Sequence, residues 1–276
     1  MTSVRLHTMS VGTAGPRIAF CHGLFGQGRN WLQIARAVAG PDEDQARALL
    51  VDLPDHGRSP WTDHFSLQAY AAAVGAQLRA VAPGERWTLV GHSLGGKVAM
   101  ILALSQPDLV ERLAVVDIAP RRYPSHGWVL DYADSLRALP LATLPDRASA
   151  DALLAESIPE PAVRAFLLQN LRRGRDHAWR WQANLDVLAG DGSGSGGVGD
   201  WPEGDATAYR PFRGRVVWLA GADSPYVTEA DVEPMRRLFP FVRLVVVKDA
   251  GHWVHSDQPE VVVEVLRRLL RPRRHH

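Results

Sequence analysis

The segment Gly91-His92-Ser93-Leu94-Gly95 restricts the fold of this chain more than any other, because it joins an apolar run to a helical pattern. Residues 87–90 are typical of a buried strand, and the small apolar residues of 96–105 are typical of a helix. A strand, a tight turn and a helix are the context that a G-x-S-x-G nucleophile elbow requires. Glycine at both ends of such a turn lets neighbouring backbone approach closely. We therefore predict that Ser93 is a nucleophile; the alternative is a serine that only caps a helix.

A nucleophilic serine needs a base and a third group that orients this base. Where the serine lies on a G-x-S-x-G turn between a strand and a helix, both groups follow it in the chain. Residues 244–247 indicate a buried strand, and residues 259–270 indicate a helix. His252 lies in the loop between them, at a strand end, where it could reach the elbow. We predict that His252 is the base, and that the nearby His255 is structural.

Two aspartates compete for the role of the acid. Asp117 follows the apolar run 113–116, and Asp223 follows the apolar run 216–220. Each of them also has a plain interpretation, because a loop aspartate commonly bonds its own backbone and starts a turn. The pattern predicts that one of the two pairs with His252, and leaves open which.

An oxyanion hole requires two backbone N–H groups that point at the carbonyl oxygen as its charge develops. Leu94, the residue after the nucleophile, is predicted to supply one of them at the positive end of the elbow helix. The second is expected from the loop after an early strand, and residues 18–26 supply an apolar run and a His-Gly turn. Leu24 is the candidate donor and Phe25 the alternative; an ordinary glycine-rich turn is the other interpretation.

Short apolar runs alternate with helical patterns through the first 120 residues. This alternation is typical of an α/β fold, in which a mostly parallel, doubly wound sheet carries helices on both faces. From residue 121 the pattern is helical and interrupted by prolines, and strand patterns return only at residue 215. We predict an α/β core of residues 1–120 and 214–276, with a helical cap of residues 121–213 inserted into it.

The cap is expected to narrow the entrance and to shape an acyl pocket. Its large apolar side chains are candidate lining residues, although packing of cap against core is the commoner role of such side chains. These candidates are Trp128, Tyr132, Phe166, Leu167, Trp179 and Trp181. The glycine- and serine-rich run 190–197 predicts a mobile loop. Lys97, one turn into the elbow helix, is predicted to be a solvated or paired surface lysine, with contact to an anionic substrate as the alternative.

The charge balance offers no basis for binding nucleic acid or an anionic membrane, since 31 basic and 30 acidic residues leave a formal charge of +1. Cys21 is the single cysteine, so no internal disulfide can form, and we expect it to behave as a small apolar residue. Residues 1–15 lack a signal-peptide pattern, which predicts a cytoplasmic protein. No cofactor and no metal are expected, and the chain is predicted to act as a monomer or homodimer on a small molecule.

Several motifs spread over nearly the whole chain agree with a known group. They include His22-Gly23-Leu24-Phe25-Gly26, Gly91 to Met100, Val116-Asp117-Ile118-Ala119-Pro120, Ser224-Pro225-Tyr226-Val227 and Gly251-His252-Trp253-Val254-His255. On these motifs the chain resembles the α/β-hydrolase superfamily and, within it, the small bacterial esterases related to mammalian abhydrolase domain-containing protein 11.

The resemblance implies an α/β-hydrolase fold with an inserted helical cap and a triad acid at Asp117. It further implies that Ser224 is a fourth member of the site, hydrogen-bonded near His252. Asp223 stands beside Ser224, one residue away from the usual acid position of the superfamily. A shift by one residue points a loop side chain elsewhere, whereas hydrogen-bond reach is required. We therefore favour Asp117 as the acid and keep Asp223 as the alternative.

One motif departs from the resemblance. Leu53-Pro54 stands before Asp55 and the His56-Gly57 pair, where the esterases typically carry Arg-Asn. Leu-Pro is commoner in other α/β-hydrolases, including a pyruvate-eliminating enzyme of menaquinone synthesis.

The predicted function is a serine hydrolase that cleaves small to medium acyl esters or thioesters through an acyl-enzyme. The alternatives are a carbon–carbon bond hydrolase or a pyruvate-eliminating lyase of the same fold, or a ligand-binding receptor with little turnover.

Overall fold

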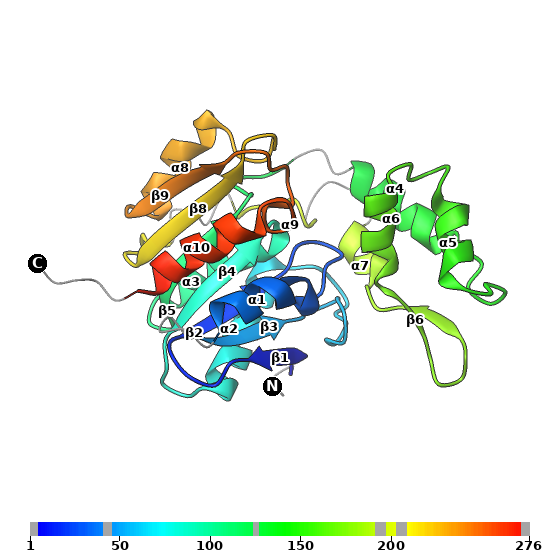
Figure 1. Cartoon of the computed structure of the whole chain (residues 1–276), viewed down its shortest axis with the longest axis horizontal. Coiled ribbons are helices and arrows are strands. Elements are labelled where there is room, and N and C mark those ends of the chain that lie inside the picture. The colour runs from blue at the N-terminus through cyan, green and yellow to red at the C-terminus, as the bar shows by residue number, and fades with distance from the viewer. Residues whose placement is uncertain (1–4, 41–45, 124–126, 191–196, 203–208, 272–276) are drawn as a thin grey trace, which may run out of the picture.

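A seven-stranded sheet forms the centre of the computed structural model, which describes residues 5–40, 46–123, 127–190, 197–202 and 209–271 (Figure 1). The strands lie in the order β1-β3-β2-β4-β5-β8-β9. β1 runs antiparallel to β3, and all other neighbours are parallel. The strands span Thr8–Val11 (β1), Arg17–Cys21 (β2), Arg47–Val51 (β3), Trp87–His92 (β4), Val110–Val116 (β5), Arg215–Gly221 (β8) and Val242–Val247 (β9). The prediction of a mostly parallel α/β sheet is confirmed.

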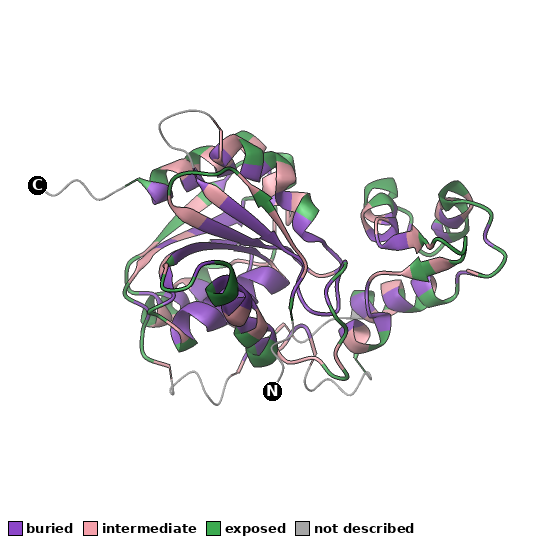
Figure 2. Ribbon diagram, turned by 90° about the horizontal axis from the view of Figure 1, so that it is seen from below, coloured by how far each residue is buried: buried purple, intermediate pink, exposed green. Residues whose placement is uncertain are grey.

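Helices cover both faces of this sheet, as predicted for a doubly wound fold. One apolar core joins the sheet to α1, α9 and α10, and a second core joins it to α2, α3 and α8. These helices span Leu32–Val38 (α1), Leu67–Val81 (α2), Leu94–Ser105 (α3), Val232–Leu238 (α8), Val254–Asp257 (α9) and Pro259–Leu270 (α10), and two short 3-10 helices span Gly28–Trp31 (η1) and Glu229–Asp231 (η2). Figure 2 shows the buried residues gathered in the strands and on the sides of the helices that face them.

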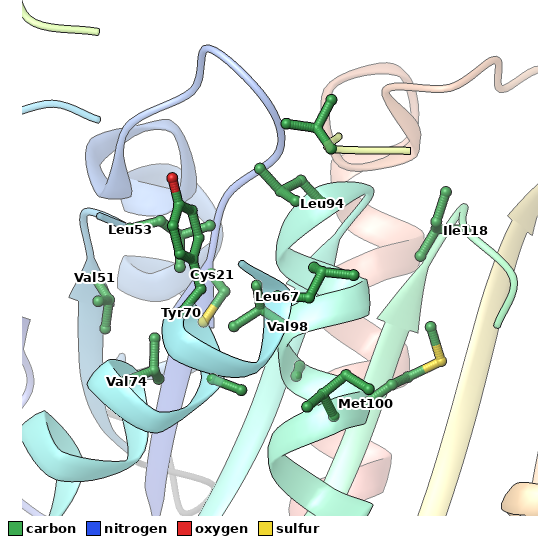
Figure 3. Packing of buried hydrophobic residues seen from close by; sticks show 14 of the residues in the cluster. Cys21, Val51, Leu53, Leu67, Tyr70, Val74, Leu94, Val98, Met100 and Ile118 are labelled. Carbon is green, nitrogen blue, oxygen red and sulfur yellow. The ribbon is translucent and has the colours of Figure 1, made fainter. Parts of the chain in front are cut away.

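The elbow helix α3 lies at the centre of the second core, and its residues from Leu94 to Leu104 are all buried. Figure 3 shows Tyr70 and Val74 of α2 in one cluster with Val98 of α3 and with strand residues such as Cys21. A helix buried on all sides has little freedom to shift. Its N-terminus, where Ser93 lies, is therefore held firmly at the carboxyl end of β4.

Lys97 does not lie on the helix surface, so the prediction for this residue was wrong. Its side chain is only 2% exposed, and Nζ donates to the carbonyl oxygens of Gly199, at 2.5 Å, and Asp200, at 2.9 Å. Nζ also lies 4.9 Å from the centre of the Tyr123 ring. Burial lowers the pKa of Lys97 to about 7. The sequence around Lys97 carries no sign of this contact, because the segment that covers it lies about 100 residues away.

The chain between β5 and β8 forms a group of helices on one side of the core (Figure 1). The helices span Gly127–Arg137 (α4), Arg147–Leu154 (α5), Pro161–Leu168 (α6) and Leu185–Ala189 (α7). The expectation that this part lacks strands was wrong, since Leu171–Arg173 (β6) and Trp179–Trp181 (β7) form an antiparallel pair. Strands of three residues are too short to show an alternating pattern. The placement of the cap boundaries at residues 121 and 213 remains a prediction.

A buried aspartate anchors this inserted part on the core. The carboxylate of Asp55 accepts hydrogen bonds from Thr62, from the Tyr70 hydroxyl at 2.5 Å and from Asn184 Nδ2 at 2.8 Å. The Asn184 N–H donates to the Asp55 carbonyl oxygen at 2.9 Å. Asn184 precedes α7, so these bonds join the inserted helices directly to the loop after β3.

Residues 191–196 of the predicted mobile loop lie outside the described residues. None of the helices in the described part of the chain combines the length and the apolar character needed to cross a membrane.

Candidate active site

Ser93 occupies a strained turn between β4 and α3. Its backbone has φ 51° and ψ −118°, a conformation that non-glycine residues adopt rarely and mainly at functional sites. The turn is possible because two neighbours lack side chains: a Cβ on Gly91 would lie 2.2 Å from the Gly95 carbonyl oxygen, and a Cβ on Gly95 would lie 2.4 Å from the Cys21 carbonyl oxygen. The glycines therefore allow the sharp turn that the elbow motif predicts.

The structure brings Asp117 and His252 together. Oδ2 of Asp117 lies 2.8 Å from Nδ1 of His252. Asp117 is fully buried after β5, and its Oδ1 accepts a hydrogen bond from the Gly221 N–H at 2.9 Å. The His252 side chain is 23% exposed, and its ring stacks on Tyr226 with centroids 3.9 Å apart. A buried carboxylate thus orients a histidine whose other side faces the solvent-accessible part of the site.

Ser224 and Asp223, which are adjacent in sequence, have different environments. The Ser224 hydroxyl donates to Asp117 Oδ2, the same oxygen that contacts His252. Asp223 is exposed, and its backbone N–H donates to the Ala250 carbonyl oxygen at 3.0 Å. The structure therefore brings Ser224 to the acid and leaves the Asp223 side chain on the surface. The loop after β8 points these two neighbouring side chains in different directions, as expected when a shift by one residue reverses the direction of a side chain.

The early His-Gly turn lies directly against the elbow. A Cβ on Gly23 would be 2.8 Å from His92 Nδ1 and 3.3 Å from Ser93 Cβ. The N–H of Phe25 donates to His56 Nε2 at 3.2 Å, so this amide is already engaged. Within the described part of the chain, the amides of Leu24 and Leu94 donate to no other group. The geometry thus favours Leu24 over Phe25 as the partner of Leu94 in an oxyanion hole.

Amide side chains of the inserted segment hold the loop that carries Leu24. Asn170 Nδ2 donates to the Phe25 carbonyl oxygen at 2.7 Å, and Gln27 Nε2 donates to Asn170 Oδ1 at 2.8 Å. Asn30 Nδ2 donates to Gln169 Oε1 at 2.9 Å. Asn170 is almost fully buried. These residues were not among the sequence predictions, because their role depends on contacts between segments about 140 residues apart.

Two buried histidines support the same loop from the core. His22 Nδ1 donates to the Gly23 carbonyl oxygen at 2.8 Å, and His22 Nε2 accepts the Leu53 N–H at 3.0 Å. His56 Nδ1 donates to the Pro54 carbonyl oxygen at 2.8 Å, and its Nε2 accepts the Phe25 N–H. Only a neutral imidazole donates with one nitrogen and accepts with the other. Burial lowers the pKa of His22 to about 4. Burial and the nearby His22 together lower the pKa of His56 to about 3. The role of His22 was not predicted, although this histidine stands in a His-Gly pair.

His92 and His255 complete a layer of histidines beneath the site. His92 Nε2 donates to the His252 carbonyl oxygen at 2.8 Å. The His255 ring stacks on Trp31 at 4.4 Å between centroids and lies 4.7 Å from the His92 ring. Burial lowers the pKa of His255 to about 4, and that of His92 well below its ordinary value. The position of His255 fits the predicted structural role, although this residue also borders the cavity described below.

These neutral histidines predict an acid-sensitive fold. Between pH 6.5 and about 4 the unfolded chain binds protons at these rings while the folded chain does not, so the free energy of unfolding must fall as the pH falls through this window. A shift from 6.5 to about 4 corresponds to about 3 kcal/mol per histidine. Urea denaturation measured at several pH values should show this slope.

His255→Phe provides the matched test of that slope. Phenylalanine can keep the stacking on Trp31 but takes up no proton, so the free energy of unfolding should depend less steeply on pH, by about one proton. His64→Gln removes an exposed histidine and serves as the control. An unchanged slope in His255→Phe would contradict the assignment of a buried neutral ring at this position.

A cavity of about 220 Å³ opens beside Ser93 and His252. It is lined mainly by apolar and aromatic side chains from the inserted helices and the adjoining loops. The cap residues among them are Trp128, Tyr132, Val163, Phe166 and Leu167, joined by Leu24, Phe25, Tyr226 and Trp253. Four of the six predicted lining residues therefore border the cavity. Trp179 and Trp181 do not: both lie on β7, and Trp179 Nε1 donates to the Leu144 carbonyl oxygen.

Cys21 is unsuited to nucleophilic catalysis, as the sequence analysis expected. It is fully buried in β2, and burial raises the pKa of its thiol to about 12. A thiol at neutral pH would then hold its proton, and only the thiolate is a good nucleophile. The described residues also contain no group of three or more His, Cys, Asp or Glu side chains arranged to hold a metal ion.

Comparison with known proteins places this geometry in a family. The chain matches the model of the alpha/beta hydrolase fold over residues 16–259. It belongs to the α/β-hydrolase family. The fold prediction and the resemblance stated from the motifs are both confirmed. The chain is an esterase- or lipase-type hydrolase, since its relatives are named as such.

Three similar proteins show how far the agreement extends. The mouse sn-1-specific diacylglycerol lipase ABHD11 is 35% identical over 92% of this α/β-hydrolase and 81% of its own length. Esterase YbfF of Escherichia coli is 30% identical over 92% of both chains. The structure of a marine microorganism esterase superposes with a TM-score of 0.88 at 28% identity, over 97% of this chain and 100% of the other. The similarity thus includes the core as well as the inserted helices.

Proposed function

We propose that this α/β-hydrolase cleaves small to medium carboxylic acyl esters or thioesters through an acyl-enzyme on Ser93. The observation that carries the proposal is the 2.8 Å contact between Asp117 and His252 beside a cavity that Ser93 and His252 both line. A carboxylate, a histidine and a serine in this chain order are the components of nucleophilic acyl transfer. The names of the relatives, an esterase and a diacylglycerol lipase, support an ester as the substrate.

In the proposed mechanism, Ser93 Oγ attacks the carbonyl carbon of the substrate while His252 Nε2 takes the hydroxyl proton. Asp117 remains ionised, holds the Nδ1 proton of His252 and stabilises the imidazolium. The amides of Leu24 and Leu94 donate to the oxyanion of the tetrahedral intermediate. His252 then gives its proton to the leaving alcohol or thiol. Water, deprotonated by the same histidine, releases the acid and regenerates the serine.

Ser224 is proposed to support the acid rather than to react. Its hydroxyl and the Gly221 N–H both donate to the Asp117 carboxylate, in addition to the contact with His252. These contacts satisfy and orient the buried Asp117 carboxylate toward His252, as the mechanism requires.

The cavity suggests the size of the acyl group. Drug-sized ligands occupy cavities of about 300–1,000 Å³, whereas the cavity at Ser93 measures about 220 Å³. Aromatic and aliphatic walls such as Phe166 and Leu167 suit an acyl chain and offer it few polar partners. An acyl group of small to medium length fits this space, and longer chains would extend into water.

A series of p-nitrophenyl acetate, butyrate, octanoate and palmitate tests the proposal. We expect a burst of p-nitrophenol equal to the enzyme concentration, as an accumulating acyl-enzyme requires. We expect kcat/KM to be highest for butyrate or octanoate and at least about tenfold lower for palmitate, since two unburied methylenes already cost about 1.6 kcal/mol. The matching acyl thioesters would compare the two kinds of leaving group.

Tight binding of these esters without release of p-nitrophenol would refute the hydrolase and favour a binding protein. The highest kcat/KM with palmitate would refute the proposed substrate size while leaving the reaction intact.

A further inference from the structure

A second cavity, of about 130 Å³, lies on the other side of the loop that carries the candidate oxyanion donor. Residues 23–26 and Asn30 border the catalytic cavity, whereas Gln27, Gly28 and Arg29 border this one. The remaining walls come from the core strands β1 and β3, from the loop after β3 and from the β6–β7 pair. They comprise His7, Met9, Leu50, Asp52, Arg58, Arg172 and Gln182. We refer to this space as the arginine cavity.

Positive charge dominates the arginine cavity. Arg29, Arg58 and Arg172 line it, and Arg147 is close enough to act electrostatically on both Arg29 and Arg172. None of the four forms an ion pair within the described part of the chain. Many other arginines of the chain do so, for example Arg164 with Asp151 at 2.8 Å. Cations gathered around one cavity without an acidic ion-pair partner indicate a place for an anion.

Asp52 is the one acidic residue in the wall of the arginine cavity, and both of its carboxylate oxygens already accept hydrogen bonds from backbone N–H groups. Its Oδ1 accepts the Gly28 N–H at 2.7 Å, and its Oδ2 accepts the Arg58 N–H at 2.9 Å. The carboxylate therefore serves to hold two backbone segments in place. One negative charge also leaves most of the charge of four guanidinium groups uncompensated.

The charges of these arginines act on one another. Burial, followed by the charges of neighbouring arginines, lowers the pKa of both Arg29 and Arg172. Despite the lowered pKa, an arginine remains protonated at neutral pH. The repulsion between the guanidinium groups is therefore present in the folded protein. Two arginines are also held in fixed orientations: Arg172 Nε donates to Gln182 Oε1 at 2.8 Å, and an Arg147 guanidinium N–H donates to the Leu171 carbonyl oxygen.

We propose that the arginine cavity binds a phosphoryl dianion, either free phosphate or the phosphate group of a small organic molecule. A guanidinium presents paired donors that match the oxygens of phosphate. A tetrahedral group with several acceptor oxygens can contact more than one of these arginines at once, and its double charge offsets more of their repulsion than a carboxylate would. Bound there, the anion would contact the segment 27–29 from the side opposite the catalytic cavity.

Isothermal titration calorimetry of the whole protein with inorganic phosphate, at constant ionic strength and a pH where phosphate is a dianion, tests the proposal. We expect saturable binding to the parent protein. Arg29→Gln and Arg172→Gln should each weaken it about tenfold, because a hydrogen bond to a charged group contributes about 1.5 kcal/mol or more. Arg175→Gln is the matched control: it removes the same charge from the loop between β6 and β7, at an exposed residue outside the cavity.

Thermal melting of each variant establishes that it is folded before titration. Failure of phosphate to bind saturably to the parent protein would overturn the proposal, and so would equal weakening by Arg175→Gln, which would indicate only a general effect of charge. Glycerol 3-phosphate in a parallel titration distinguishes the sources: equal affinity indicates the phosphate ion, and at least tenfold tighter binding indicates an organic phosphate. Since binding is also measurable in Ser93→Ala, the result does not depend on the proposed catalysis.

Discussion

Ser93→Ala is expected to lower kcat for p-nitrophenyl butyrate by roughly three or more orders of magnitude. The alanine side chain has no oxygen that could form the proposed acyl-enzyme, so only the proposed transition-state contacts, such as those from the Leu24 and Leu94 amides, would remain. The strained backbone at φ 51° should persist, because the glycines around it are unchanged. Steady-state and burst kinetics on the purified variant measure both effects.

Ser105→Ala is a suitable control for the loss of a hydroxyl. Ser105 ends α3, and its hydroxyl donates to the Ile101 carbonyl oxygen at 2.7 Å, away from the cavity. This variant should keep a rate close to that of the parent protein. Hydrolysis by Ser93→Ala at nearly the parent rate, with the burst intact, would show that another residue is the nucleophile.

Asp117→Asn is expected to lower kcat by roughly three to four orders of magnitude, as in enzymes where an amide replaces the triad acid. The amide can donate to His252 Nδ1 and so leave the ring protonated at Nε2, where it could no longer take the serine proton. The Gly221 N–H, which now donates to Asp117 Oδ1, would still have an amide oxygen as partner. Circular dichroism and melting should therefore show a folded protein with a defective base.

Asp223→Asn makes the same chemical change on the surface and should alter kcat by less than about twofold, since surface substitutions away from the site usually have small effects. The comparison is made with the same ester and at the same pH. A larger loss in Asp223→Asn than in Asp117→Asn would transfer the role of the acid to Asp223.

The parts of the candidate site whose arrangement could be expected from the sequence share one property: they depend on short segments. The elbow needs Gly91 and Gly95 within four positions of each other, because a Cβ at either would collide with backbone. Asp117 and His252 each follow a strand, and parallel strands end at one edge of the sheet. Residues from distant segments were therefore expected near one another without knowledge of their contacts.

The errors and omissions share the opposite property. Lys97 was expected on the surface, but the carbonyl oxygens of residues 199 and 200 cover it. The β6–β7 pair was missed because each strand has three residues. Asn170, which holds the loop of the candidate oxyanion donor, lies in the inserted segment and shows no local pattern of its own. Each of these depends on a partner far away in the chain.

The sequence by itself determined the fold class and the order of the candidate catalytic residues, because apolar periodicity and the absence of Cβ atoms act over a few residues at a time. Only the tertiary structure decided which aspartate meets His252, since Asp117 and Asp223 follow equally plausible strands and differ in the direction of one side chain. It also decided that three arginines from separate segments line one cavity, with a fourth close to them. Contacts of that kind depend on how elements pack in three dimensions, and spacing along the chain does not encode them locally.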